Sequence, residues 1–260
     1  MTGLLSGKTV VISGVGTGLG REVALKAHQD GANVVLGART QENLEKLATE
    51  LDDTGGTAAW AVTDINDASA CQGLIDTAAE KFGAVDALVN VAAKEDVFGG
   101  IEGADLAQWQ AMLNTNVVGT LQLVQAAVPE LKKNGGSVVF IGSQSAFHPQ
   151  LPQSAYATSK GALQNAMYQL AKELGPHKIR LNMVVPTWMY GPPIQLYIGL
   201  VAQQRGITQE EVLAELTAKF PLGEMPADED VADAVVFFAS DRARMVTGQT
   251  LFVNAGEYFA

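Results

Sequence analysis

Short apolar runs alternate with longer stretches of helical spacing along most of the chain. Seven of these runs are rich in small or branched apolar residues, and several are apolar at every position, as burial on both faces of a sheet requires. They predict strands over residues 8–13, 33–38, 57–62, 85–90, 137–142, 179–185 and 249–254. Helical spacing predicts one helix over residues 21–30, ending at Gly31, and another over residues 41–51.

Strands that alternate with helices in this way form βαβ units, whose crossovers are right-handed. The pattern therefore predicts an α/β fold, a doubly wound and mostly parallel seven-stranded sheet with helices on both faces. In such a sheet a ligand lies beyond the C-terminal ends of the strands, where the strand order reverses. No linker or repeat marks a boundary, so we expect residues 1–260 to form a single domain.

Acidic residues outnumber basic ones by 28 to 17, which gives a formal net charge of −11. A field of this sign repels nucleic acid and anionic lipid, so neither is an expected partner, and no apolar run approaches the length of a membrane span. Cys71 is the single cysteine, which excludes an intrachain disulfide and favours a cytoplasmic protein. The three histidines are widely separated, so we expect no metal site.

A glycine-rich turn directly follows the first predicted strand and opens the first predicted helix. Glycines let the chain turn sharply, let the backbone approach a pyrophosphate, and let the helix pack on the sheet. The amides at a helix N-terminus stabilise such an anion. The order of strand, turn and helix predicts a dinucleotide site of the Rossmann type, with candidate contacts Gly14, Thr17, Gly18, Leu19 and Gly20.

The end of the second predicted strand bears on the choice of dinucleotide. An acidic residue that binds the adenosine ribose usually stands about 20 residues beyond the glycines. Here that position is Ala38, and the next residue is Arg39, whose guanidinium can bind a ribose 2′-phosphate. NADP(H) is therefore the favoured cofactor, and NAD(H) stays the alternative.

Candidate catalytic residues lie in the second half of the chain. Tyr156 and Lys160 are four residues apart in a stretch of helical periodicity, so both side chains lie on one helix face. A phenol is a poor base at neutral pH unless a nearby cation favours its phenolate, and Lys160 is placed to lower the pKa of Tyr156. Ser143 follows the fifth predicted strand, where its hydroxyl can bind a carbonyl oxygen.

Together these residues resemble the short-chain dehydrogenase/reductase family over nearly the whole chain. Gly14-x-x-x-Gly18-x-Gly20 is similar to its cofactor turn, Tyr156-x-x-x-Lys160 to its active-site pair, and Ser143 stands thirteen residues before Tyr156, as in the family. Asn116 matches the family's helix asparagine. The resemblance implies that Tyr156 transfers the proton, Lys160 tunes it and holds the nicotinamide ribose, Ser143 orients the carbonyl and Asn116 positions a relay water.

Further matches concern the cofactor. Asp64 and Ile65 resemble the pair that contacts adenine, Asn90 the first residue of the fourth-strand motif, and Met189 the apolar residue near the carboxamide. Three departures follow from the same resemblance. The motif Asn-Asn-Ala-Gly is replaced by Asn-Val-Ala-Ala at residues 90–93, Pro-Gly by Pro-Thr at 186–187, and a common threonine by Gly191.

The stretch 187–220 is expected to form two short helices as a substrate lid. Its apolar and aromatic character favours a hydrophobic ligand, and cyclic or steroid-like ketones fit this expectation. The residues thus predict an NAD(P)-dependent oxidoreductase acting on a ketone or secondary alcohol. An epimerase or dehydratase, and a non-catalytic cofactor-binding or scaffold protein, are the alternatives. The resemblance also implies a homo-oligomer, a tetramer or dimer, with the aromatic tail 257–260 docking on a neighbour.

Overall fold

The structure is a computed structural model that describes residues 3–52, 56–149 and 152–259. Within these residues seven strands form one sheet in the order β3-β2-β1-β4-β5-β6-β7, and every neighbouring pair is parallel. The expected α/β fold is confirmed, and the predicted strand ends are correct to within two residues. The strands are β1 Thr9–Ser13, β2 Asn33–Ala38, β3 Ala58–Val62, β4 Ala87–Asn90, β5 Gly136–Ile141, β6 Ile179–Pro186 and β7 Gln249–Val253.

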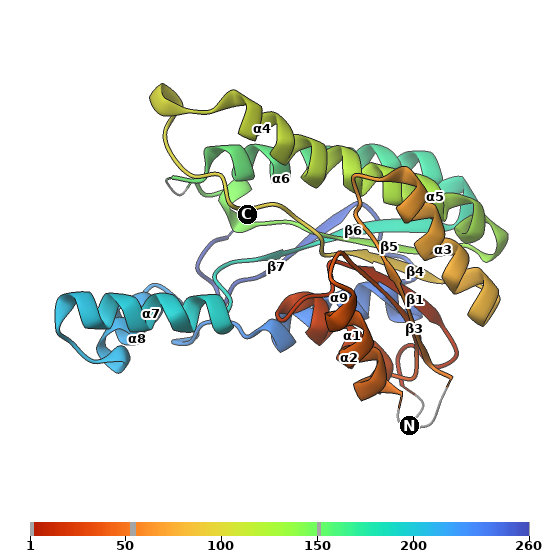
Figure 1. The fold of residues 1–260 in the computed structure, drawn as a ribbon, viewed down its shortest axis with the longest axis horizontal. Helices are drawn as coiled ribbons and strands as arrows, with labels where there is room; N and C mark the ends of the chain where they lie inside the picture. The colour runs from red at the N-terminus through yellow and green to blue at the C-terminus, as the bar shows by residue number, and fades with distance from the viewer. Residues whose placement is uncertain (1–2, 53–55, 150–151, 260) are drawn as a thin grey trace.

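Helices cover both faces of the sheet (Figure 1). One layer holds α1 Leu19–Gln29, α2 Gln41–Leu51 and α9 Asp228–Ala239. The other holds α3 Ala68–Phe82, α4 Leu106–Leu113, α5 Thr120–Asn134 and α6 Ser154–Leu174. The first helix begins two residues earlier than the spacing predicts, because the backbone from Leu19 onward is already helical.

Each face of the sheet has its own apolar core. Val10 and Ile12 of β1 belong to the core under α1, α2 and α9, whereas Val11 belongs to the core under α3, α5 and α6. Successive side chains of a strand point to opposite faces, so a strand buried on both faces must be apolar at every position. This is the physical reason why continuous Val and Ile runs predict the strands of this sheet.

Strand order reverses between β1 and β4. The chain runs outward through β1, β2 and β3, then returns to place β4 on the other side of β1 and continues to β7. Beyond the C-terminal ends of these two strands the flanking loops separate to opposite faces. The fold therefore places the glycine turn after β1 next to the segment after β4.

Two helices follow β6 in the region expected to form a lid. They are α7 Pro192–Arg205 and α8 Gln209–Thr217, and they extend to one side of the main body (Figure 1). Ile198, Ala202 and Val212 form a small apolar cluster between them, separate from the two cores of the sheet. The predicted pair of short helices is confirmed, and its role as a substrate lid stays a prediction.

The C-terminal turn connects this lid to the sheet. The Glu257 carboxylate accepts a hydrogen bond from Gln144 Nε2 at 2.8 Å and also contacts the Thr187 hydroxyl and the Lys219 ammonium. Tyr258 packs on Phe252 of its own chain, with ring centroids 5.5 Å apart. Tyr258 therefore packs within its own chain, and the docking of the tail on a neighbour stays a prediction.

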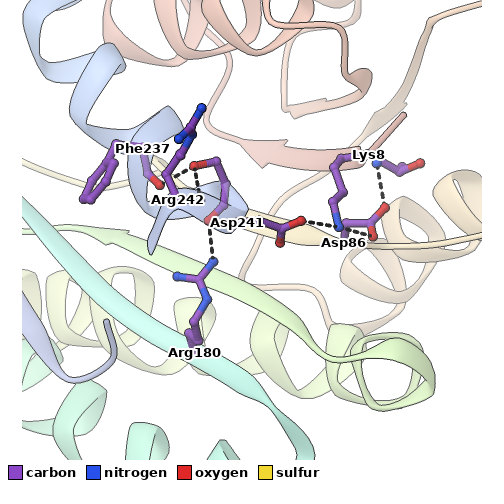
Figure 2. A network of polar contacts seen from close by, with 8 residues as sticks. Lys8, Asp86, Arg180, Phe237, Asp241 and Arg242 are labelled. Carbon is purple, nitrogen blue, oxygen red and sulfur yellow. Dashed lines mark hydrogen bonds and ion pairs between the residues drawn. The ribbon is translucent and has the colours of Figure 1, made fainter. Parts of the chain in front are cut away.

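A network of hydrogen bonds and ion pairs lies at the N-terminal ends of the strands, away from the C-terminal ends where a ligand is expected (Figure 2). The Asp86 carboxylate accepts from the Thr9 backbone N–H at 2.8 Å and lies 3.6 Å from Lys8 Nζ. Arg180 of β6 donates to two carbonyl oxygens at the end of α9, at 2.8 and 3.1 Å. These contacts fix the starts of β1, β4 and β6, which leaves the other edge for ligands.

The long apolar helix that a membrane span requires does not occur in the described part of the chain.

Replacing Asp86 with Ala tests this network. The substitution leaves the buried Thr9 N–H without its acceptor, so the free energy of unfolding should fall by about 1–3 kcal/mol. Urea denaturation monitored by circular dichroism measures it. Asp233→Ala, which removes an exposed ion pair with Lys26, is the control and should change the free energy by at most about 0.5 kcal/mol. Equal losses in both variants would show that the network contributes nothing specific.

Candidate active site

The residues singled out in the sequence gather at the C-terminal ends of the strands. Gly14 follows β1, Arg39 follows β2, Asn90 ends β4 and Ser143 lies two residues beyond β5. Tyr156 and Lys160 are on α6, whose first turn packs beside the short helical turn Gln144–Ala146 after Ser143. The parallel sheet thus brings segments from five parts of the chain to one edge.

The glycine turn is shaped by close backbone contacts. Gly14 has φ of +79°, and its N–H donates to the Gly37 carbonyl at 2.8 Å. A Cβ at Gly14 would lie 2.2 Å from the Ala92 nitrogen, and one at Gly20 would lie 2.3 Å from the Gly14 carbonyl oxygen. Any side chain at Gly14 or Gly20 would collide with backbone, so both positions require glycine.

The same turn leaves room for a ligand. Apart from the adjoining residues, the described part of the chain places no atom within 4 Å of a Cβ built on Gly16, and near one built on Gly18 it places Asp228 Oδ2 at 3.5 Å. Thr17 is exposed, whereas the Leu19 side chain is buried, so only the backbone of Leu19 is available to a ligand. An open cradle at the N-terminus of α1 fits a pyrophosphate.

The residues predicted to bind the adenosine part of the cofactor lie just beyond the ends of β2 and β3. Arg39 follows β2 and is exposed, and its contact with a ribose phosphate stays a prediction. Asp64 Oδ1 accepts from the backbone and side-chain nitrogens of Asn66, each at 2.9 Å. The Ile65 side chain is buried in a core, and its carbonyl accepts from Gln122 Nε2 at 2.8 Å. The Ile65 side chain thus belongs to the core, and the contact of the pair Asp64 and Ile65 with adenine stays a prediction.

Asn90 joins the two strands at the reversal point. Its Oδ1 accepts from the Ser13 hydroxyl at 2.5 Å, and its Nδ2 donates to Thr120 Oγ1 at 2.8 Å. The side chain is 3% exposed. The Asn90 side chain thus connects the end of β4 to β1 and to α5. Its contact with a cofactor stays a prediction.

Asn116 lies in a π-helical segment, Asn114–Gly119, between α4 and α5. Such widened turns often occur at functional sites. Its side chain bonds twice to the Lys94 backbone, accepting at 2.6 Å and donating at 2.8 Å, and also donates to Ser159 Oγ at 2.9 Å. Asn116 therefore fixes the segment after β4 against α6, and its role toward a relay water stays a prediction.

Ser143, Tyr156 and Lys160 form a connected group. The Ser143 and Tyr156 side chains are hydrogen-bonded, and Ser143 Oγ is 2.9 Å from Ser145 Oγ. Lys160 Nζ lies 5.5 Å from the centre of the Tyr156 ring and donates to the Ile141 carbonyl at 2.8 Å. The spacing in the sequence thus predicts correctly which side chains share one helix face.

Burial is the largest cause of the pKa shifts of both Tyr156 and Lys160. Burial and the nearby Glu95 carboxylate raise the pKa of Tyr156, although the hydrogen bond with Ser143 acts in the other direction. Burial lowers the pKa of Lys160 to about 8, against the effect of Glu95, which raises it. Desolvation of the phenolate thus dominates the shift of the Tyr156 pKa, and the expectation that Lys160 lowers this pKa stays a prediction.

Glu95, which the sequence motifs do not indicate, acts electrostatically on Tyr156 and Lys160. It is exposed and follows Lys94, whose backbone is held by Asn116, so its charge acts on both Tyr156 and Lys160. The sequence signal was the run Lys94-Glu95-Asp96 directly after the fourth-strand motif. Carboxylates just beyond the end of a parallel strand belong to the ligand edge of the sheet.

Aromatic side chains line the lid side. Trp188 and Tyr197 meet edge to face with centroids 5.6 Å apart, and Lys219 Nζ lies 5.1 Å from the Trp188 ring. Met189 is partly buried and packs against the core under α1 and α9. These contacts agree with the aromatic character of the lid, and the contact of Met189 with a carboxamide stays a prediction.

The chain resembles known proteins over nearly its whole length. Residues 14–257 match the family described as Enoyl-(Acyl carrier protein) reductase. 2-(S)-hydroxypropyl-CoM dehydrogenase 3 of Xanthobacter autotrophicus is 32% identical over 98% of each chain. Dehydrogenase/reductase SDR family member 4 of Homo sapiens is also 32% identical, over 97% of this chain and 88% of its own. The chain belongs to the short-chain dehydrogenase/reductase family.

A solved structure is also similar to the chain over nearly its whole length. L-sorbose reductase from Gluconobacter frateurii, complexed with NADPH and L-sorbose, has a TM-score of 0.92 at 26% identity and covers 99% of this chain and 98% of its own. The family binds a nicotinamide cofactor, and the protein is therefore an NAD(P)-dependent oxidoreductase.

The influence of Glu95 on Lys160 is testable without substrate. Glu95→Gln removes the charge that favours the ammonium, so the pKa of Lys160 should fall below about 8. NMR titration of the lysine side chains, with the Lys160 signal assigned from Lys160→Met, measures it. Glu45→Gln, on α2, removes an equal charge outside the site and should leave this pKa unchanged. An unchanged pKa in Glu95→Gln would contradict the assigned coupling.

Proposed function

We propose that this protein reduces an uncharged, largely apolar ketone to a secondary alcohol with NADPH, through Tyr156, Lys160, Ser143 and Asn116. The observation that carries the proposal is the Tyr156 phenol, hydrogen-bonded to Ser143 and adjacent to the Lys160 ammonium, at the sheet edge that carries the open glycine turn. The chemistry supplied by a bound nicotinamide is hydride transfer to the carbonyl carbon.

Ser143 orients the substrate carbonyl. Its hydroxyl is already hydrogen-bonded with Tyr156, and Ser145 N–H donates to Ser143 Oγ at 3.3 Å. When the carbonyl is reduced, negative charge develops on its oxygen. In the proposed complex this oxygen accepts hydrogen bonds from the hydroxyls of Ser143 and Tyr156. Pre-arranged donors of this kind stabilise the developing alkoxide.

Tyr156 delivers the proton. Its raised pKa keeps the phenol protonated at neutral pH, which is the form that can protonate an alkoxide. The oxidative direction requires the phenolate, which burial and Glu95 disfavour. These side chains are therefore arranged for reduction near neutral pH.

Lys160 supplies the positive charge beside this phenol. With a pKa of about 8, it is mainly an ammonium at neutral pH and loses its charge as the pH rises through that value. Its donation to the Ile141 carbonyl fixes its position. The rate of reduction should therefore decline as the pH rises above about 8. Asn116 holds the loop after β4 that completes this part of the site.

The substrate class is inferred from the walls of the site. Trp188 and Tyr197 offer an aromatic surface, and the Glu95 carboxylate disfavours an anionic substrate. L-sorbose, bound in the structural relative, is an uncharged ketone. Cyclic and steroid-like ketones are the first compounds to test. We infer a homo-oligomer from the family resemblance and a cytoplasmic location from the single cysteine.

Tyr156→Phe tests the acid role. Loss of the proton donor should lower kcat by about 10²–10⁴-fold, whereas the dinucleotide Kd should stay within about threefold. NADPH oxidation over a panel of ketones, together with fluorescence titration of the dinucleotide, measures both. Tyr168→Phe is the matched control, since Tyr168 is on the same helix but 43% exposed, and it should keep full activity. Near-normal turnover by Tyr156→Phe would show that Tyr156 is not the proton donor. If the unmodified protein binds the dinucleotide but reduces no ketone of the panel, a non-catalytic cofactor-binding or scaffold protein is favoured.

Arg39→Ser tests the choice of cofactor. A charged hydrogen bond to the 2′-phosphate is worth about 1.5–3 kcal/mol, so the Kd for NADPH should rise by about 10–100-fold while that for NADH barely changes. Arg244→Ser, an exposed arginine beyond α9, is the control and should leave both constants unchanged. If NADPH and NADH lose affinity equally, Arg39 does not read the phosphate.

A further inference from the structure

A buried carboxylate lies beside the glycine turn and is not used by the proposed chemistry. Asp228 is the first residue of α9 and is 8% exposed. Within residues 3–52, 56–149 and 152–259, no donor lies within hydrogen-bonding distance of its carboxylate and no cation within ion-pairing distance. The carboxylate borders the open space over the turn, so a ligand that enters this space meets a carboxyl group that no described side chain engages.

The Asp228 carboxylate points between the cofactor turn and the segment after β6. Its Oδ2 lies 3.5 Å from a Cβ built on Gly18 and 2.8 Å from one built on Gly191. The open space over the turn at Gly16 and Gly18 is the place where a pyrophosphate fits. The Asp228 side chain therefore borders that space.

Gly191, after β6, leaves room for this carboxyl group because it has no side chain. Because Asp228 Oδ2 lies 2.8 Å from the missing Cβ, the carboxyl group of α9 occupies the space that the side chain at 191 would fill. A side chain at position 191 would therefore displace the Asp228 carboxyl group.

An ionised carboxylate in this position would repel a pyrophosphate. The surroundings oppose ionisation, because burial, Glu229 and Glu22 raise the pKa of Asp228. Other charges on the packed elements are already paired: Arg21 with Glu22 at 2.8 Å, and Lys26 with Asp233 at 3.0 Å. Asp230 Oδ2 accepts from the Ala227 N–H at 2.8 Å, and the segment after β6 adds only the phenol of Tyr190.

We propose that Asp228 binds the dinucleotide as a neutral carboxylic acid, donating a hydrogen bond to a pyrophosphate oxygen, so that binding takes up a proton. The proton comes from solvent and stays on Asp228, and no covalent bond changes. The inference rests on the proposed use of the glycine turn for the dinucleotide, and it adds a pH dependence to cofactor binding. It is independent of the roles assigned to Tyr156 and Lys160.

Isothermal titration calorimetry with NADH tests the proposal. NADH is the main probe because it lacks the 2′-phosphate, whose own titration near pH 6 would add protons. Titrations between pH 5 and 8 in buffers of different ionisation enthalpy should show uptake of up to one proton. The affinity should fall, by at most about tenfold per pH unit, as the pH rises through the pKa of Asp228 in the free protein.

Variants identify the group that takes up the proton. Asp228→Asn keeps the shape and a donor but cannot ionise, so it should bind NADH with no proton uptake and little pH dependence. Asp228→Ala combined with Gly191→Thr should restore binding through a hydroxyl, again without uptake. Glu229→Gln is the matched control, because it removes an adjacent charge and should keep the uptake. Circular dichroism and melting temperature check that each variant folds.

The outcomes separate the proposals. The inference is overturned if the unmodified protein binds NADH without taking up a proton, or if Asp228→Asn still takes one up. Either result leaves the proposed dinucleotide site intact. Binding that needs Mg²⁺ and is lost in EDTA also overturns it, because the carboxylate would then act through a metal ion. Failure of the unmodified protein to bind either NADH or NADPH overturns the proposed function and the inference together.

Discussion

Burial of the Lys160 ammonium against the end of β5 is the constraint on which the site depends. The side chain is 4% exposed, and Nζ donates to the Ile141 carbonyl at 2.8 Å. Removing a cation from water is costly, so the contact must be kept and the pKa of the lysine falls. The contact fixes the rotation of α6, which in turn holds Tyr156, one helical turn earlier, beside Ser143. Packing and acid–base chemistry are therefore consequences of the same buried contact.

Most of the fold could be predicted because its signals are local. A strand buried on both faces must be apolar at every position, and this continuous pattern located β1 through β7 with small errors at their ends. The glycine turn is equally local, since Gly14 and Gly20 are required by contacts within and beside the turn. Tyr156 and Lys160 were predicted to share a face because helix geometry alone brings residues four apart together.

The missed features depend on segments that are distant in the sequence. The charge of Glu95 acts on α6 only because Asn116 holds the loop after β4, and no periodicity reports that contact. Asp228 approaches Gly18 only because α9 packs on α1. The pKa of Tyr156 could not be predicted either, because the spacing reveals the nearby lysine but not the depth of burial. Desolvation is a property of the assembled fold.

The small cluster of Ile198, Ala202 and Val212 between α7 and α8 gives the lid a core of its own. Substitutions on its outer surface therefore leave the two main cores untouched, and Leu196 and Leu200 already expose 66% and 58% of their surfaces there. Mutational tolerance should therefore be greater on the outer surface of these two helices than in the layers that cover the sheet.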